Sequence, residues 1–454
     1  MPEKILLTVT GLAHDGRGIG FIQPGHKAVF VTGALPGQTI ECSITRHKKT
    51  FCEAELLSII GSSLSEQPPH CPHADQCGGC PLQAMPYDEQ LKWKSRLVQD
   101  ALQRIGKLPG EKLEHAGHTI LASPATRAYR NKIELAFGLN GHDLSLGFRK
   151  RSSHMVFNLQ HCALVDKSAM PIIFQCRELA SRSRIKRLLR FFTLRQDSGG
   201  YWHGILLTSP ASASQRQDIL ALGRKLIECD ANLVTLTHEE RAQKDLLAKG
   251  ERRIVTLDKT GEINSNAGCI TLPLQNRYFK LDVASFFQVN TKAAEQLVDV
   301  AQQFNEQTSG PLLDVYCGVG APGQLLADRH ESCLGLELEK TATKYALLNA
   351  QPLPSWQYKP GDAAAMLRGL AHNKIGFETA LLDPPRQGLA KDALSALMNI
   401  APGHIIYISC NPSTLARDSN ALNQKYELQK LMCVDMFPHT PHVECLTLWR
   451  KKIS

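Results

Sequence analysis

The chain has 454 residues, of which 43% are hydrophobic and 21% charged, and its formal net charge is +9. This composition is ordinary for a soluble globular protein, and the length suggests roughly three domains. The longest apolar runs are only strand-length, which excludes a transmembrane span. The N-terminus lacks a signal-peptide pattern, so we expect a cytoplasmic location. The positive charge permits nucleic-acid binding without requiring it.

Residues 1–62 are expected to form a small all-β unit. Short strands are predicted at residues 5–9, 19–22, 28–31 and 39–44, with turn-forming residues between them. Strands this short at this spacing are typical of a barrel of the oligonucleotide-binding kind. Such a barrel either binds RNA or only packs against its neighbours, and the segment itself leaves both open.

The central region, residues 63–280, begins with a cysteine-rich segment. The chain has 14 cysteines and no export signal, which argues against disulfides. A C-x5-C-x2-C run and one distant cysteine supply four candidate ligands: Cys71, Cys77, Cys80 and Cys162. Iron–sulfur clusters commonly use four thiolates, often three close together and one distant. Zinc prefers closely spaced pairs or Cys/His sets, and the neighbouring histidines keep zinc as an alternative.

The rest of the central region combines one helix with basic clusters. An amphipathic helix is predicted over residues 87–107, because apolar side chains recur on one face. Basic residues gather at 127–132, 149–151 and 182–195. Such clusters usually only solvate a surface. Their place between a barrel and a catalytic domain favours a track for RNA phosphates.

In residues 281–454 strands alternate with helices, which indicates a doubly wound α/β domain. One strand runs into a turn with Gly318 and Gly320, where glycine lets the backbone approach a cofactor. Glu337 ends the next strand, and a carboxylate at that place suits a ribose diol. Asp362 follows a third strand, near the expected adenine. The full dinucleotide fingerprint is missing, so the pattern fits S-adenosylmethionine better.

Three further strands place candidate catalytic groups at the same edge of the sheet. Asp383 ends one strand and is followed by a rigid proline pair. Cys410 ends the next strand, and Glu444 precedes the last. Ligands bind outside the carboxyl ends of strands in open α/β sheets, so Cys410 is a candidate nucleophile. The alternatives are a buried apolar cysteine and a solvated loop glutamate.

These groups suit methyl transfer to a pyrimidine. C5 of a pyrimidine is a poor nucleophile, but a thiolate that adds to C6 makes C5 enolate-like, so that it can take a methyl group from a sulfonium. A base must then remove the C5 proton so that the thiol can leave. Cys410 and Glu444 fit these two roles, and base flipping brings the target out of its stack.

Two long motifs resemble those of the RumA-type 23S ribosomal RNA (uracil-5-)-methyltransferases, and the resemblance runs over nearly the whole chain. They are SCNPSTLARD at residues 409–418 and MFPHTPHVE at residues 436–444. The resemblance implies that Cys410 is the nucleophile and Glu444 the base. It also implies an N-terminal TRAM barrel, a central [4Fe-4S] domain and a Rossmann-like S-adenosylmethionine-dependent methyltransferase domain.

The resemblance also assigns residues to both cofactors. The implied cluster ligands are Cys71, Cys77, Cys80 and Cys162. The positions that match cofactor and substrate residues, beside the two turn glycines, are Gln288, Tyr316, Glu337, Asp362 and Asp383. The expected partner is 23S ribosomal RNA in a single-stranded or loop region, whose bases can be splayed out. We expect the protein to be a monomer.

The chain departs from the family pattern after Gly320. The family usually has a polar residue and a phenylalanine-containing helix start there, whereas this chain has Ala321-Pro322-Gly323. Proline is tolerated at a helix start, so the fold is expected to survive. Ala321 has no polar side chain, so weaker cofactor binding is expected.

Three alternative functions stay open. A transfer-RNA uracil-5-methyltransferase would use the same chemistry on another substrate. Cytosine-5 methylation usually involves two cysteines, and the strand that ends at Asp383 carries no thiol. A metal-containing RNA-binding protein with an inactive transferase domain is the third, because of the altered segment after Gly320.

Overall fold

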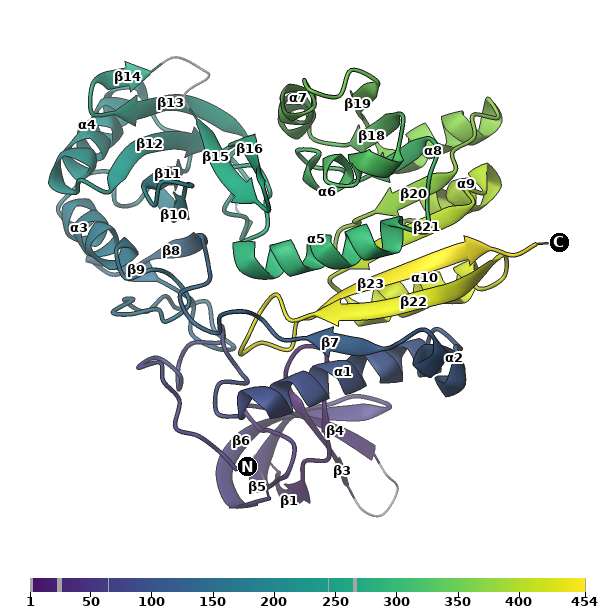
Figure 1. Cartoon of the computed structure of the whole chain (residues 1–454). Helices are drawn as coiled ribbons and strands as arrows, with labels where there is room; N and C mark the ends of the chain where they lie inside the picture. Colours follow the sequence, from purple (N-terminus) through teal and green to yellow (C-terminus); the bar gives the residue numbers. More distant parts are fainter. Residues whose placement is uncertain (1–2, 23–26, 64, 244, 264–267, 454) are drawn as a thin grey trace.

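The computed structural model of the chain describes residues 3–22, 27–63, 65–243, 245–263 and 268–453. Figure 1 shows an N-terminal barrel, a central α/β unit and a larger C-terminal α/β unit, with helix α1 (Tyr87–Arg104) between the barrel and the large sheet. Among the described helices, none is both long enough and apolar enough to cross a membrane.

The first unit is a closed barrel. Its strands are β1 (Lys4–Thr8), β2 (Gly11–Leu12), β3 (Gly18–Ile22), β4 (Lys27–Thr32), β5 (Gln38–His47) and β6 (Phe51–Ser62). They form one sheet in the order β1-β5-β6-β4-β3-β2. Because β1 and β2 follow each other in the chain but lie at opposite ends of this order, the sheet closes on itself. The four predicted strands correspond to β1, β3, β4 and β5, and β2 and β6 are additional strands.

The central unit is built on a second sheet. Its strands are β8 (Lys132–Asn140), β9 (Asp143–Gly147), β10 (Leu189–Gln196), β11 (Trp202–Thr208), β12 (Leu233–Glu240), β13 (Arg252–Asp258) and β14 (Gly261–Ile263), and its helices are α3 (Ala169–Ser181) and α4 (Ala213–Cys229). Only β11 and β12 are parallel, and α4 is the crossover between them. Ser212 and Gln215 form a capping box that starts α4.

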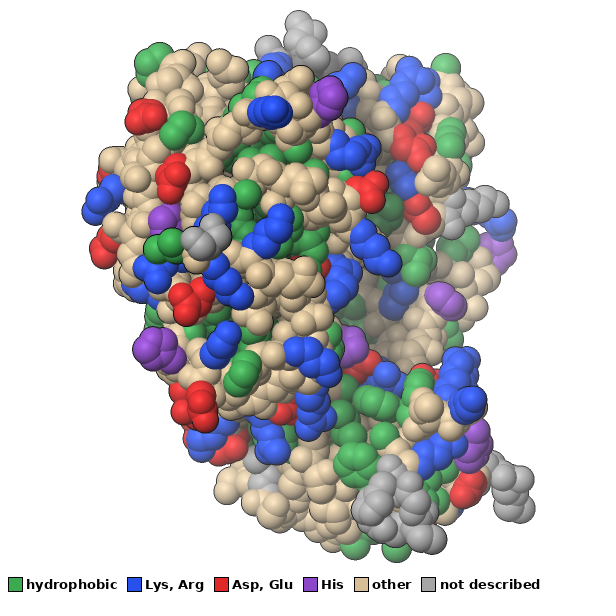
Figure 2. All heavy atoms as spheres, turned by 90° about the vertical axis from the view of Figure 1, so that its right-hand side faces the viewer, with side chains coloured by type: hydrophobic (Ala, Val, Ile, Leu, Met, Phe, Trp, Pro, Cys, Tyr) green, Lys and Arg blue, Asp and Glu red, His purple; other side chains and the backbone are tan. Residues whose placement is uncertain are grey.

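The basic residues of this unit are not all available to RNA. Arg195 is only 1% exposed and donates to the carbonyl oxygen of Ser285 at 2.6 Å. Arg190 donates to three backbone carbonyls of the segment 241–245. The predicted phosphate track over residues 182–195 is therefore wrong for these two side chains. On the face drawn in Figure 2, Lys and Arg side chains are spread out and interspersed with Asp and Glu.

The C-terminal unit is a Rossmann-like sheet with helices on both faces, as predicted. Its strands are β17 (Leu312–Val315), β18 (Cys333–Glu337), β19 (Trp356–Pro360), β20 (Thr379–Leu382), β21 (His404–Ser409), β22 (Tyr426–Val434) and β23 (Glu444–Lys451). Its helices are α5 (Thr291–Asn305), α6 (Ala321–Gln324), α7 (Lys340–Asn349), α8 (Ala363–His372), α9 (Lys391–Ile400) and α10 (Pro412–Leu422). The strands lie in the order β19-β18-β17-β20-β21-β23-β22-β7. From β17 the chain builds the sheet outward to β19 on one side, and from β20 it continues on the other side. Ligands bind at this switch point in open α/β sheets.

The boundary between the central and catalytic units differs from the predicted division at residue 281. Strand β7 (Thr119–Leu121) joins the catalytic sheet beside β22, and α1 packs on α10. Strands β15 (Cys269–Leu274) and β16 (Arg277–Asp282) form a hairpin whose apolar residues belong to the core around α5. The predicted division therefore cuts through β16 and leaves β7 on the wrong side. Local sequence pattern does not reveal which sheet a three-residue strand joins.

Candidate active site

The glycine turn after β17 has the geometry that a cofactor loop needs. Tyr316, Gly318 and Gly320 all have positive φ, of 66°, 55° and 81°. The N–H of Gly318 donates to Oε2 of Glu337 at 3.0 Å, and the N–H of Glu339 donates to Oε1 at 2.8 Å. The Glu337 carboxylate lies at the end of β18, as the sequence predicts, and it is tied to the turn after β17.

A pocket opens between this turn and α5. Among the predicted cofactor residues, Gln288, Tyr316, Gly318 and Asp383 line it. The other three do not. Gly320 is the N-cap of α6, and a Cβ there would meet the side chains of Gln324 and Tyr358. Asp362 caps α8 and accepts the N–H of Ala365 at 2.9 Å. Glu337 does not line the pocket itself but is hydrogen-bonded to Gly318, which does.

Cys410 and Glu444 lie opposite one another across two antiparallel strands. Strand β21 ends at Ser409, which pairs with Cys445 of β23. Cys410 follows Ser409 and Glu444 precedes Cys445, so the antiparallel register brings the two side-chain positions together at the edge of the sheet. Glu444 is only 4% exposed, so the reading of it as a solvated loop residue is wrong.

Burial controls the protonation of this pair. It raises the pKa of Cys410 to about 11, with Glu444 adding to the rise and Arg386 opposing it. It also raises the pKa of Glu444 well above its usual range, and Asp383 contributes to that rise. Burial raises the pKa of Asp383 to about 7. A carboxylate with a raised pKa is a stronger proton acceptor once it is ionised.

Arg386 is a site residue that the sequence does not reveal. It is the cation that lowers the pKa values of Cys410 and Glu444 against the effect of burial. Its carbonyl oxygen accepts from Nδ2 of Asn411 at 3.0 Å, and its guanidinium lies 3.3 Å from Nε2 of His442. The one signal for it is its position directly after Asp383 and the two prolines.

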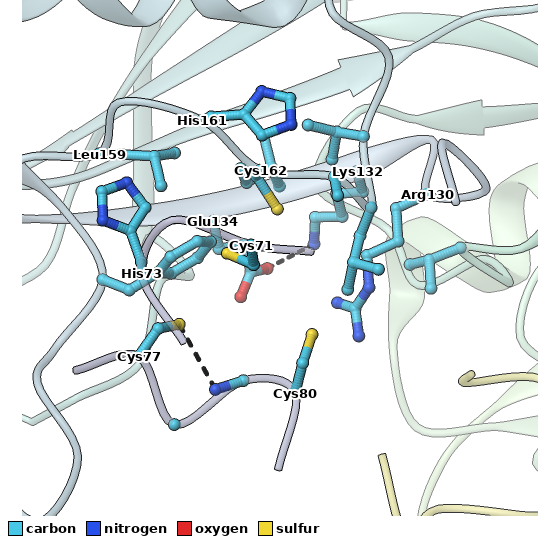
Figure 3. A pocket seen from close by; sticks show the side chains of 18 of the residues that line it. Cys71, His73, Cys77, Cys80, Arg130, Lys132, Glu134, Leu159, His161 and Cys162 are labelled. Carbon is cyan, nitrogen blue, oxygen red and sulfur yellow. Dashed lines mark hydrogen bonds and ion pairs between the residues drawn. The ribbon is translucent and has the colours of Figure 1, made fainter. Parts of the chain in front are cut away.

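The four predicted ligand cysteines line a second cavity, of about 570 Å³. Figure 3 shows Cys71, Cys77, Cys80 and Cys162 pointing into it from two separate segments. Burial raises the pKa of Cys80 to about 12, and the neighbouring thiols of Cys162 and Cys77 add to the rise. The N–H of Gly79 lies 3.4 Å from Sγ of Cys77.

Despite this arrangement, no three His, Cys, Asp or Glu side chains in the described part of the chain converge closely enough to hold one metal ion. The cavity and the pocket beside the glycine turn share Phe286 and Phe287 in their walls. The two sites are therefore neighbours, separated by the segment 286–289.

The sequence matches the tRNA (Uracil-5-)-methyltransferase family over residues 234–352 and 362–452, and the TRAM domain over residues 3–57. It is 32% identical over 464 residues to an uncharacterized RNA methyltransferase of Nitratidesulfovibrio vulgaris, covering 98% of this chain and 96% of that protein. A similarly named protein of Halalkalibacterium halodurans is 30% identical over 468 residues, covering 99% and 97%. The chain belongs to the RNA (uracil-5-)-methyltransferase family.

Family membership confirms the resemblance seen in the two long motifs. The solved structure of a Pyrococcus abyssi tRNA (uracil-54, C5)-methyltransferase, in complex with S-adenosyl-L-homocysteine, superposes with a TM-score of 0.72 at 23% identity. The match covers 98% of this chain and 100% of that one. The likeness shows a common fold over 98% of this chain. This length includes the TRAM barrel and the Rossmann-like methyltransferase domain.

The departure from the family pattern after Gly320 has its own packing. The sequence pattern predicts a helix that includes residues 324–327, but α6 ends at Gln324 and is followed by one 3-10 turn (Ala327–Arg329). Glycine is a weak helix former, but Gly323 is needed because a Cβ there would overlap Oδ2 of the buried Asp314. Gln324 turns inward and donates to Oη of Tyr358 at 3.1 Å.

Proposed function

We propose that the protein transfers a methyl group to C5 of a specific uridine in 23S ribosomal RNA through a covalent adduct between Cys410 and uracil C6. The observation that carries the proposal is the opposition of Cys410 and Glu444 across β21 and β23. It supplies a nucleophile and a separate base, which this reaction requires at two different steps. The adjoining pocket, lined by Tyr316, Gly318 and Asp383, lies where a methyl donor would bind.

Each side chain has one task in the proposed reaction. Cys410 loses its proton and attacks C6 of a flipped uracil, and the electron pair of the C5–C6 bond becomes available at C5, where it forms the bond to the methyl group. Asp383, at the junction of the cofactor pocket and Cys410, is placed to contact the base. Glu444 then takes the C5 proton, the double bond reforms, and the thiolate leaves. Arg386 stabilises the negative charges of Cys410 and Glu444.

The residues beside the glycine turn fit S-adenosylmethionine, whose sulfonium supplies the methyl group. Gln288 and Tyr316 face the pocket, and Glu337 presents a carboxylate fixed by two backbone N–H groups. The fold relative from Pyrococcus abyssi is described in complex with S-adenosyl-L-homocysteine, the corresponding demethylated product. A missing polar group at Ala321 is expected to weaken binding without abolishing it.

We further propose that the four-cysteine cavity holds a [4Fe-4S] cluster. Four thiols line one cavity, and after burial, which is the larger cause, Cys71 and Cys77 both raise the pKa of Cys80 and of Cys162. Zinc also accepts four thiolates, about 2.3 Å from one point, so the metal content of the purified protein decides between the two. A cluster spreads its ligands around a larger body. The protein groups that would hold it are the four thiolates, with Gly79 donating toward Cys77.

The cluster proposal predicts about four iron atoms per chain after anaerobic purification. Cys80→Ser should lower the iron content and the visible absorbance. Cys229→Ser is the matched control, because this free thiol is exposed and lies outside the cavity. Stoichiometric zinc in place of iron would show that the cavity binds a different metal.

Transfer RNA is the second candidate substrate, because the Pyrococcus abyssi fold relative is named as a transfer-RNA enzyme. Mapping 5-methyluridine in 23S ribosomal RNA and in transfer RNA from a strain that lacks this protein separates the two. We expect one position in 23S ribosomal RNA to lose the modification. Loss confined to transfer RNA would replace the ribosomal assignment and leave the chemistry intact.

A further inference from the structure

One loop of the catalytic sheet contacts both other units. Residues 435–443, which we call the base loop, connect β22 to β23 and end where Glu444 begins β23. Gly16 of the barrel lies so close that a Cβ on it would be 3.3 Å from Cγ of Pro441 and 3.0 Å from Cγ of Pro81. The barrel and the cysteine-bearing segment therefore both border the loop that leads to the proposed base.

Gln90 of α1 anchors the base loop with one side chain. It is fully buried, and its Oε1 accepts the N–H of His439 at 2.8 Å. Its Nε2 lies 3.3 Å from Nδ1 of His439 and also donates to the carbonyl oxygens of Leu82 at 3.1 Å and Met85 at 2.8 Å. Gln90 thus joins α1, the segment that follows Cys80, and the base loop.

His439 is held on several sides. Its φ of 68° lies in the left-handed region, which residues other than glycine rarely adopt and which the surroundings must enforce. Its Nε2 lies 3.1 Å from the carbonyl oxygen of Thr126, and its ring centroid is 4.7 Å from that of His70. Because a carbonyl can only accept, Nε2 carries the hydrogen and Nδ1 accepts from Gln90.

The start of the base loop has a separate anchor. Oδ1 of Asp435 lies 2.5 Å from Nζ of Lys94, and its Oδ2 accepts from the hydroxyl of Tyr87 at 2.8 Å. This pair fixes where the loop begins, whereas Gln90 and His439 fix its middle, next to the turn into Glu444. Lys94 also donates to the carbonyl oxygen of Phe437 at 3.0 Å, two residues before His439, so the test below leaves Lys94 and Asp435 unchanged.

We infer that Gln90 and His439 form a positioning pair that holds Glu444 in the geometry needed for proton removal. The inference rests on the proposed function and extends it. Cys410 follows Ser409 of β21, and the turn that carries it is held by contacts outside the base loop: Nδ2 of Asn411 donates to the carbonyl oxygen of Arg386 at 3.0 Å, and the N–H of Asn411 donates to Oγ of Ser409 at 3.3 Å. The pair consequently governs the elimination step and leaves the formation of the adduct intact.

This division has a chemical consequence. In the elimination, Glu444 takes the C5 proton, the C–H electron pair forms the C5–C6 double bond, and the C6–Sγ bond breaks to return the thiolate. A displaced carboxylate slows only this step. Methylated RNA then stays attached to Cys410, which denaturing gel electrophoresis detects as a protein–RNA adduct.

The test uses the full-length protein with Gln90→Glu and His439→Asn. Glutamate matches glutamine in shape but cannot donate, and asparagine tolerates positive φ while losing the reach to Thr126. Release of methylated RNA should fall about 100-fold, the loss that a misplacement of about 1 Å causes, and adduct with unmodified RNA should accumulate. Trapping by RNA with 5-fluorouridine, which stops before proton removal, should keep its wild-type rate.

Two further variants complete the design. Gln99→Ala removes a glutamine further along α1 and should change neither rate. His439→Gln keeps a donor toward Thr126 and should restore part of the release. If trapping falls in proportion to release, or if neither changes in Gln90→Glu, the positioning role is wrong. If the wild-type protein itself is not trapped, the proposed function fails instead.

Discussion

Cys410, directly after β21, and Glu444, at the start of β23, occupy facing positions because β23 runs antiparallel to β21. A parallel strand would begin at the opposite edge and carry Glu444 away from Cys410. Strands β17 to β21 all pair in parallel, so the reversal at β23 is what places a base beside the nucleophile. The loop that makes the reversal is the base loop.

Glu444→Gln should block the reaction after methyl transfer. General acid–base groups contribute roughly 100-fold to 10,000-fold to rate, so turnover should fall by at least about 100-fold while adduct with unmodified RNA accumulates. The measurement is single-turnover kinetics resolved on denaturing gels. Glu427→Gln, on an exposed residue at the other end of β22, is the control. Loss of adduct in Glu444→Gln would assign the carboxylate to an earlier step.

Adduct formation should accelerate as the pH rises. The pKa of Cys410 is raised to about 11 by burial and by Glu444, so the thiolate fraction of the free protein increases about tenfold for each pH unit below that value. Trapping rates with 5-fluorouridine RNA at pH 7, 8 and 9 test this. Arg386→Gln should be slower at every pH, because the cation that favours the thiolate is gone. A rate that stays flat from pH 7 to 9 would contradict the account.

Asp314→Asn should stabilise the protein at alkaline pH. Burial, with Asp383 and Glu337, raises the pKa of Asp314 from 3.8 to about 8. The folded state then binds this proton more tightly than the unfolded state, so wild-type stability falls as the pH rises from about 4 to about 8.

Because each pKa unit corresponds to about 1.4 kcal/mol, Asp314→Asn should gain a few kcal/mol over wild type at pH 8.5 and much less at pH 5.5. Urea unfolding of the cofactor-free protein at both pH values measures the difference. Asp328→Asn, on an exposed residue, should change little at either pH. An equal effect of Asp314→Asn at both pH values would rule out a titration origin.

The Lys94–Asp435 pair should be costly to break from one side. Both side chains are fully buried, and removing one partner of a buried pair costs about 3–5 kcal/mol, because an unpaired charge stays behind. Lys94→Met should therefore lower the free energy of unfolding by that amount, and Lys94→Met combined with Asp435→Leu should lose less. Arg104→Gln breaks an exposed pair and should cost about 1 kcal/mol or less. Additive losses in the double variant would show no coupling.

The sequence predicts the parallel strands and their ends well. Short apolar runs that stop at glycine, proline or a carboxylate locate β17, β18, β20 and β21, because strands buried on both faces carry continuous apolar residues. Their shared edge then brings Tyr316, Asp383 and Cys410 together. The sequence also singles out the four cysteines that line one cavity, three of them by their C-x5-C-x2-C spacing.

What the sequence does not predict depends on contacts between distant segments. Nothing local to residues 119–121 indicates that β7 joins the catalytic sheet, because strand pairing is set by the partner. Arg386 and Gln90 look like ordinary polar residues until the fold brings them to the active site and the base loop. Gly320, Glu337 and Asp362 match the expected motif but do not line the pocket: Gly320 caps α6, Asp362 caps α8, and Glu337 accepts backbone N–H groups.

The most direct test of the central claim is covalent trapping on RNA that carries 5-fluorouridine, in the presence of S-adenosylmethionine. Wild-type protein should form a denaturation-resistant adduct, because fluorine at C5 cannot be removed as a proton. Cys410→Ser should form none, since a hydroxyl is a far weaker nucleophile than a thiolate, whereas Cys229→Ser should match wild type. Equal trapping by wild type and Cys410→Ser would contradict the assignment of Cys410 as the nucleophile.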